Sequence, residues 1–161
     1  MMGMVIPVGG LTTILTDVRL YGQAGLETGA MLLGRMGEQQ VDIVALLGER
    51  GIERHPDHLV ISGVALATLF DWADDRDARV LAQLHSHGLS ALMSVTDQRF
   101  GLTVEGFTSA IVPEAACPPA DPSRWGWWMF RGGLWEPSAP ARVAEGSCLT
   151  VVFDESGVRD G

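Results

Sequence analysis

The sequence contains no lysine and no asparagine, so all eleven of its basic residues are arginine. Biased codon usage is the simplest explanation, because composition supports only broad inferences. Acidic residues number twenty, and the formal net charge is −9. A chain this acidic repels phosphate backbones, and its arginines form no local basic patch. We therefore expect no binding to nucleic acid.

Long hydrophobic runs and cysteines are also scarce. No run approaches the roughly 18 apolar residues that a membrane helix needs, so we expect no membrane span. The N-terminus lacks the basic region of a secretory signal, which favours a cytoplasmic location. Cys117 and Cys148 show no CxxC spacing. They are more typical of two reduced thiols than of a disulfide scaffold or a cysteine zinc site.

The hydrophobic pattern predicts a single domain over residues 1–161 with an α+β (α/β-like) fold. Such a length buries about two-thirds of the surface of the unfolded chain. Strands with helices packed on the sheet, without strict βαβ alternation, predict this fold class. The segment 80–87 is apolar on both faces, which predicts a central strand. Helices are predicted over 11–24 and 63–78, strands over 27–34, 40–48, 58–62, 80–87, 107–113 and 148–154, and a hairpin over 125–137.

The stretch QLHSHGLSALMSVTDQ, residues 83–98, contains two of the four histidines. His85 and His87 lie two positions apart on a predicted strand, so both imidazoles leave the same face. Two imidazoles on one face can ligate one zinc ion, and a catalytic zinc usually has a third protein ligand and one position for water. Asp97 can be that third ligand if the chain turns back over the strand end.

Each piece of this pattern also has an ordinary explanation. Four randomly placed histidines give an HxH in about seven of a hundred such chains. The tetrapeptide SVTD fits a helix start, with Ser94 as the N-cap and Asp97 three residues later. Their combination at the end of a central strand, where α/β-type folds build binding sites, favours a metal site.

A zinc hydrolase also needs a general base, and Glu27 is the candidate. It opens an apolar predicted strand, so its carboxylate is expected to be partly buried. Burial raises the pKa of a carboxyl towards a value that suits proton transfer. A carboxylate at the first position of a strand can equally face water, and spacing alone does not decide between these alternatives.

These residues together resemble the motif of the JAMM (also called JAB or MPN+) zinc metalloprotease family. In that motif a glutamate precedes HxH and SxxD, the order in which Glu27, HSH and Ser94-x-x-Asp97 occur here. The resemblance covers about residues 27–112, including the tract ExxxxLLG. It implies a JAB/MPN-type domain with a central mixed β-sheet flanked by helices, in a layout like that of cytidine deaminases.

The resemblance implies a zinc isopeptidase or peptidase that hydrolyses the bond after the C-terminal glycine of a ubiquitin-like modifier. His85, His87 and Asp97 would hold one Zn²⁺ per chain. Glu27 would pass a proton from the zinc water to the leaving amine, and Ser94 would donate a hydrogen bond to the oxyanion. The compact segment after Asp97 is typical of bacterial members, which implies E1-like and E2-like proteins as partners.

The chain departs from the family pattern in the loop after the second histidine. Six residues, 88–93, separate His87 from Ser94 where the family usually has seven, and Gly88 stands where proline is common. A non-catalytic MPN-type scaffold that binds a partner without metal is therefore the alternative. The presence of all five polar residues favours the enzyme. In an enzyme of this kind, the missing lysines would prevent conjugation of the chain by the system that it edits.

Two other patterns are open to interpretation. The tryptophans at 125, 127, 128 and 135 could form a partner-binding surface, but tryptophans are more often core. Alternation along a strand places 125 and 127 on one face and 128 on the other. The HPDH stretch at 55–58 could bind metal, but His-x-x-His across a proline is more typical of a surface loop.

Overall fold

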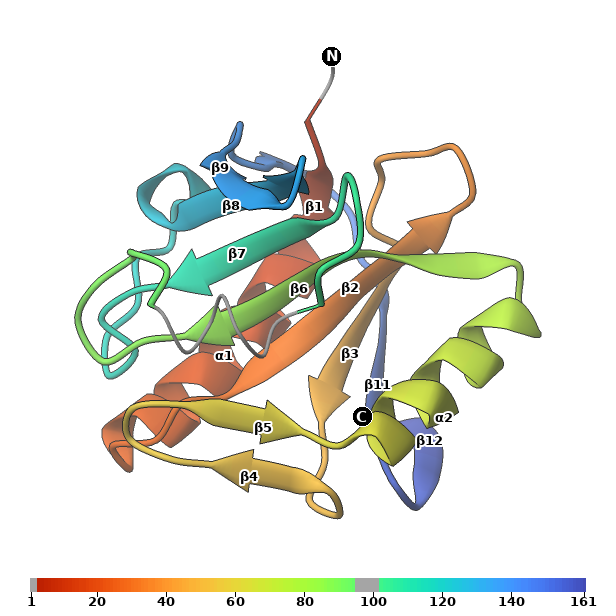
Figure 1. Cartoon of the computed structure of the whole chain (residues 1–161), viewed down its shortest axis with the longest axis horizontal. Coiled ribbons are helices and arrows are strands. Elements are labelled where there is room, and N and C mark those ends of the chain that lie inside the picture. Colours follow the sequence, from red (N-terminus) through yellow and green to blue (C-terminus); the bar gives the residue numbers. More distant parts are fainter. Residues whose placement is uncertain (1–2, 95–101) are drawn as a thin grey trace.

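The computed structural model describes residues 3–94 and 102–161 (Figure 1). The helices in these ranges are α1 (Val8–Gln23) and α2 (Gly63–Asp74), with a 3-10 turn at Pro122–Arg124. The strands are β1 (Val5–Pro7), β2 (Gly29–Arg35), β3 (Ile43–Leu47), β4 (Ile52–Arg54), β5 (Leu59–Ile61), β6 (Ala78–Ser86), β7 (Thr108–Val112), β8 (Gly126–Arg131), β9 (Leu134–Pro137), β10 (Arg142–Ala144), β11 (Leu149–Asp154) and β12 (Gly157–Asp160). Neither described helix has the length and apolar character required to cross a bilayer.

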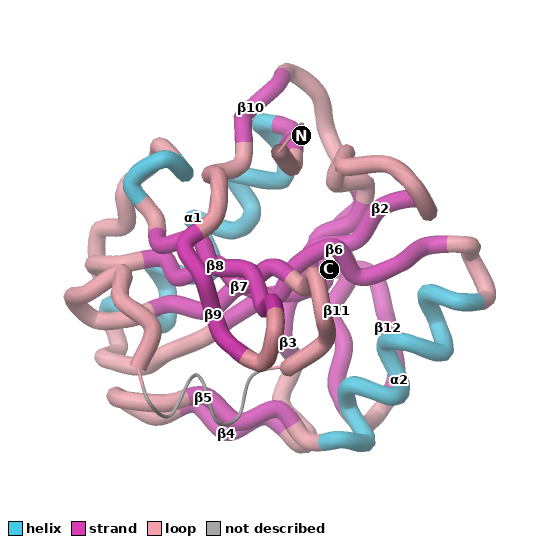
Figure 2. The backbone as a smooth tube through the Cα atoms, turned by 45° about the horizontal axis from the view of Figure 1, so that its top comes forward, coloured by secondary structure: helices cyan, strands magenta, loops and turns pink. Residues whose placement is uncertain are grey.

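Eight strands form one mixed sheet in the order β12-β11-β3-β2-β6-β7-β8-β9. The pairs β11–β3 and β6–β7 are parallel, and the remaining pairs are antiparallel. Figure 2 shows the two helices on either side of these strands. The expected α+β class, with a central mixed sheet flanked by helices, is confirmed.

Alternation along β2 builds two separate cores. Ala30 and Leu32 pack with residues of α1, whereas Met31 and Leu33 pack with residues of α2. All four side chains are buried, because β2 lies in the middle of the sheet and both of its faces are covered by a helix. A run of apolar residues with no polar alternation is the expected sequence of such a strand.

A β-bulge at Leu81 changes the face to which the second half of β6 points. Val80 and Ala82 pair with consecutive residues of β2, so Leu81 is the extra residue between them. Val80 packs on the α2 side of the sheet and Ala82 on the α1 side. In a regular strand without a bulge, residues two positions apart such as these would share a face. The bulge therefore turns His85 to the α2 side.

The main differences from the sequence-based expectations concern short strands. β5 does not join the large sheet but pairs with β4 in a separate two-stranded hairpin, and no strand was predicted at β4. Each has three residues, too few to show a periodic pattern. β1, β10 and β12, of three or four residues, were missed for the same reason.

The expectation that the tryptophans are mainly core is confirmed for two of them. Trp125 and Trp127 are buried on the α1 side, and their rings stack with centroids 5.9 Å apart. Trp128, on the other face of β8, is half-buried, and so is Trp135.

Arg54 attaches the β4–β5 hairpin to the large sheet. Its guanidinium donates hydrogen bonds to the carbonyl oxygens of Leu47 (2.8 Å) and Gly48 (2.9 Å), at the end of β3, and to Thr28 Oγ1 (3.1 Å). It also lies over the ring of Tyr21, 4.0 Å from the centroid. One side chain thus connects the hairpin to β3, to α1 and to the residue before β2.

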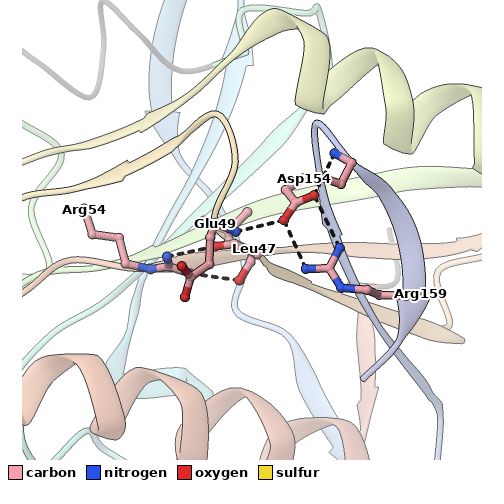
Figure 3. A network of polar contacts seen from close by, with 7 residues as sticks. Leu47, Glu49, Arg54, Asp154 and Arg159 are labelled. Atoms are coloured by element: carbon pink, nitrogen blue, oxygen red, sulfur yellow. Dashed lines mark hydrogen bonds and ion pairs between the residues drawn. The ribbon is translucent and has the colours of Figure 1, made fainter.

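The buried carboxylate of Asp154 connects the turn after β3 with the β11–β12 hairpin (Figure 3). Asp154 accepts hydrogen bonds from Arg159 (3.0 Å) and from the backbone N–H of Glu49 (2.9 Å) and Ser156 (2.8 Å). The hydrogen bond from Arg159, supported by these two N–H groups, holds the pKa of Asp154 well below its usual range. The network fixes the turn after β3 against the β11–β12 hairpin.

The partly buried Asp17 of α1 makes stability depend on pH. Burial raises the pKa of its carboxyl from 3.8 to about 6, although Arg54 lowers it. Because the folded-state pKa lies above the unfolded value, the free energy of unfolding falls as pH rises through the window between the two. We expect Asp17→Asn to stabilise the protein by about 1–2 kcal/mol at pH 7.5, with no gain at pH 4. Urea unfolding at both pH values measures this difference.

Asp71→Asn is the matched control, because Asp71 is an exposed helical carboxylate. Its effect is expected to be small and equal at the two pH values. A gain from Asp17→Asn that is the same at pH 4 and pH 7.5 would contradict the assignment.

Candidate metal centre

Glu27, His85 and His87 converge where β2 begins and β6 ends. One ligand atom of each lies within 4.8 Å of the others. The cause is strand register: Gly29 is opposite His85 in the antiparallel pair, and the Ser86 N–H donates to the Thr28 carbonyl oxygen at 2.8 Å. Continuing this register places Glu27 opposite His87. The three residues could hold a metal ion.

The two imidazoles face each other through nitrogen. Their Nε2 atoms are 3.2 Å apart, and the rings are inclined at 63°. Two nitrogens bound to one tetrahedral zinc at 2.0–2.1 Å would be roughly 3.3 Å apart. The distance between the two Nε2 atoms thus matches that of two nitrogens on one zinc ion.

The tautomer of His87 is set by the loop that follows it. Its Nδ1 lies 2.9 Å from the carbonyl oxygen of Ser90, and a carbonyl can only accept a hydrogen bond. Nδ1 therefore carries the proton, and the lone pair of the neutral ring is on Nε2, which faces His85. Metal-binding histidines in proteins are commonly oriented in this way by a backbone carbonyl.

Ser86 joins the two strands of the site through its side chain. Its Oγ accepts a hydrogen bond from the Thr28 N–H (2.9 Å) and lies 3.3 Å from the Thr28 carbonyl oxygen, to which it donates. Ser86 and Thr28 are both fully buried. The serine between the two histidines thus fixes the residue that follows Glu27.

Gly29 permits the close approach of β2 and β6 beside His85. A Cβ atom at this position would collide with the carbonyl oxygen of Leu84. Leu59 of the β4–β5 hairpin lies against the same position. Any side chain larger than hydrogen would separate the strands that carry Glu27 and the histidines.

The β4–β5 hairpin holds the backbone of Glu27 from the other side. The Glu27 N–H donates a hydrogen bond of 2.9 Å to the carbonyl oxygen of His55, in the turn of the hairpin. Figure 1 shows this turn beside the end of β6. The Glu27 side chain is only 5% exposed, so the expected burial is confirmed, whereas both histidines are half-buried.

The HPDH stretch forms its own contacts. The rings of His55 and His58 stack with centroids 4.0 Å apart, and His58 Nδ1 lies 2.8 Å from the Asp57 carboxylate. Among the described residues, neither histidine belongs to the metal-ligating group. This stretch, interpreted from the sequence as a surface loop, is a turn in which Pro56 and Asp57 are exposed and both histidines are half-buried.

Of the five motif residues, the structure brings three together. Ser94 is half-buried and is the last described residue of its segment, and Asp97 lies outside the described residues. The role of Asp97 as a third ligand therefore stays a prediction. Sequence reasoning missed Ser86 and the Ser90 carbonyl. Ser86 could have been found as the middle residue of the HxH motif. A backbone carbonyl, such as that of Ser90, leaves no signal in the sequence.

Comparison with known proteins gives a fold but no family. No protein-family model and no curated protein matches the chain. The solution structure of protein DSY2949 from Desulfitobacterium hafniense is similar, with 16% identity and a TM-score of 0.70 over 89% of this chain and 94% of that one. A crystal structure of AF2198, a JAB1/MPN domain protein from Archaeoglobus fulgidus, has 23% identity and a TM-score of 0.48 over 89% and 98% of the two chains. The first similarity shows that the fold also occurs in DSY2949.

The geometry predicts that the histidines are required for metal binding. Purified protein in zinc-containing buffer is expected to hold about one ion per chain, and His87→Ala is expected to lose it. His58→Ala is the matched control, because His58 lies in the neighbouring hairpin outside the cluster. Elemental analysis after dialysis measures the zinc. Equal loss in both variants, or no zinc in the unaltered protein, would show that these histidines are not a metal centre.

The side chain of Ser86 is expected to tune both stability and zinc affinity. Ser86→Ala leaves the Thr28 N–H buried without its partner, so the free energy of unfolding should fall by about 1–3 kcal/mol. Zinc affinity should fall about tenfold, as is usual when groups that orient metal ligands are removed. Urea unfolding and chelator competition measure these effects.

Ser109→Ala is the control for this substitution. Ser109 is equally buried on the adjacent β7, and its Oγ has no hydrogen-bond partner among the described residues. Ser109→Ala should change neither the free energy of unfolding nor the zinc affinity appreciably. If both alanine variants lose the same stability and affinity, the hydrogen bonds of Ser86 have no special role.

Proposed function

We propose that this protein is a zinc-dependent hydrolase of the JAMM type that cuts the bond after the C-terminal glycine of a ubiquitin-like modifier. The convergence of Glu27, His85 and His87 is the observation that carries the proposal. These residues were singled out from the sequence, in which Glu27 lies 58 positions before His85. Their meeting at one strand end supports the resemblance on which the proposal rests.

His85 and His87 would hold the ion through their Nε2 atoms, and Asp97 is the proposed third ligand. A bound Zn²⁺ polarises a carbonyl and lowers the pKa of water so that hydroxide is available near neutral pH. Histidine nitrogens and a carboxylate oxygen are suitable ligands for this ion. The backbone carbonyl of Ser90 would keep the His87 ring in its binding tautomer.

Glu27 would act as the general base and then as the general acid. Its carboxylate, buried beside the imidazoles, would accept a proton from the attacking water and hold it for the leaving nitrogen. Burial excludes competing solvent from this transfer. The 4.8 Å spacing also allows Glu27 to ligate the ion directly, so its role must be decided by experiment.

Ser94 is the proposed hydrogen-bond donor to the oxyanion. Contacts of this type contribute about 10²–10³-fold to the rate in other enzymes. Ser94 lies in the same segment as the Ser90 carbonyl that orients His87, which supports a position close to the site.

The substrate and partners follow from the resemblance. A ubiquitin-like protein with a glycine-terminated tail would be the substrate, either as a conjugate or as a precursor. E1-like and E2-like proteins of the same conjugation system would be partners. The loop between His87 and Ser94, one residue shorter than usual, favours a non-catalytic scaffold as the second candidate.

Replacement of Glu27, the proposed base, distinguishes the hydrolase from the scaffold and the base from a metal ligand. Glu27→Gln is expected to retain zinc and to lower the cleavage rate of a Gly-Gly isopeptide conjugate by about 10²–10⁴-fold, because the amide cannot accept the proton. Glu53→Gln, at an exposed glutamate of β4, is the control and should cut normally. The readouts are zinc content by elemental analysis and conjugate cleavage by gel assay.

Other results each point to a different conclusion. Loss of zinc from Glu27→Gln would make Glu27 a ligand. Unchanged cleavage would exclude it as the base. A zinc-loaded, unaltered protein that leaves such conjugates and the corresponding precursors intact would refute the proposed hydrolase and favour the scaffold.

A further inference from the structure

A cavity of about 730 Å³ lies at the opposite end of β6 from the histidines. It is bordered by the first residues of β6, by residues 104–108, and by parts of β8 and β9. Arg79 in its wall and His85 are six residues apart on one strand, which corresponds to about 20 Å. Figure 1 shows the two ends of β6 well separated. The cavity is therefore distinct from the metal centre.

The walls of the cavity are largely apolar. Leu81 and Trp127 line it and are buried, so their positions are fixed by the core. Phe107 and Met129 add half-buried apolar surface, and Val104 lies at the exposed rim. A volume of this size is within the range of roughly 300–1,000 Å³ that is typical of small-molecule sites.

Arg79 is a cation in this apolar wall with an unsatisfied donor. Its Nε is buried and has no hydrogen-bond partner among the described residues. Because Nε has almost no accessible surface, a ligand in the cavity would have to pair with the terminal nitrogens of the guanidinium. The cavity also contains Glu105, but its carboxylate already accepts a hydrogen bond from the Gly132 N–H at 3.1 Å.

The remaining charges lie at the rim. Arg131 and Glu136 are exposed, and Arg131 Nε is 3.1 Å from the Met129 sulfur. Exposed charges of opposite sign contribute little to binding because water screens them. The charge that determines which ligand the cavity accepts is therefore that of Arg79.

We propose that this cavity binds a small molecule with an apolar body and a single carboxylate. The carboxylate would pair with the guanidinium of Arg79, whose planar fork matches two carboxylate oxygens. The apolar body would lie against Trp127, Met129 and Phe107. The proposal does not depend on the metal centre or on the proposed hydrolase.

Calorimetric titration of the metal-free protein tests whether the cavity binds such a carboxylate. Metal is removed so that the carboxylate cannot bind to an ion at the histidines. Octanoate is the probe, octanol has the same apolar body without the charge, and inorganic phosphate has charge without the body. We expect octanoate to bind one per chain and at least about tenfold more tightly than octanol, because charge-assisted hydrogen bonds are strong. Phosphate should show no saturable binding.

Substitutions locate the site. Arg79→Gln should weaken octanoate binding about tenfold and leave octanol binding unchanged. Arg76→Gln is the matched control, because Arg76 lies over the Trp72 ring, outside the cavity, and should have no effect. Val104→Trp, at an exposed position of the rim, should obstruct entry and also weaken octanoate binding.

Three results would overturn the proposal: no octanoate binding, octanol binding as tight as octanoate, or equal weakening by Arg76→Gln and Arg79→Gln. None of them bears on zinc content or on cleavage of a conjugate. Failure here would therefore leave the proposed hydrolase untouched, and the reverse also holds.

Discussion

The antiparallel register between β2 and β6 is the constraint on which the metal centre depends. Backbone hydrogen bonds, with Gly29 opposite His85, place Glu27 beside His87. Ser86 reinforces that register through its side chain, and Gly29 allows the strands to approach closely enough. Side chains that rigid strands already hold in place lose little conformational freedom when they bind an ion. The site is thus a property of the sheet more than of its loops.

Local patterns explain what could be predicted from the sequence. His85 and His87 share a face because two residues are the repeat of a strand, and this needs no knowledge of the rest of the fold. The segment 80–87, apolar on both faces, predicts a central strand for a similar reason, and β6 lies inside the sheet. The burial of Glu27 was left open because spacing does not reveal its neighbours, among them the β4–β5 hairpin, whose turn accepts a hydrogen bond from the Glu27 N–H and whose first strand is too short to be recognised.

Long-range features account for what could not be predicted. Register between segments some fifty residues apart is set by packing of the whole sheet, so the distance from Glu27 to the histidines was not accessible from spacing. The role of Arg54, which attaches the hairpin to β3 and α1, depends on contacts with residues distant in the chain and was not predicted. The position of Asp97 stays a prediction, since it lies outside the described residues.

The bulge at Leu81 has a consequence for how this chain tolerates change in length. Because Leu81 has no partner in β2, the alternation of side chains between the two faces shifts by one residue along β6. Deletion of one residue there would leave the backbone pairing of β6 intact and would restore continuous alternation. The same deletion would leave His85 opposite Gly29, so both imidazoles would stay on the α2 side of the sheet. A length change absorbed at the bulge thus preserves the site, whereas a deletion between Ala82 and His85 would shift the register with Gly29 and turn the imidazoles to the other face.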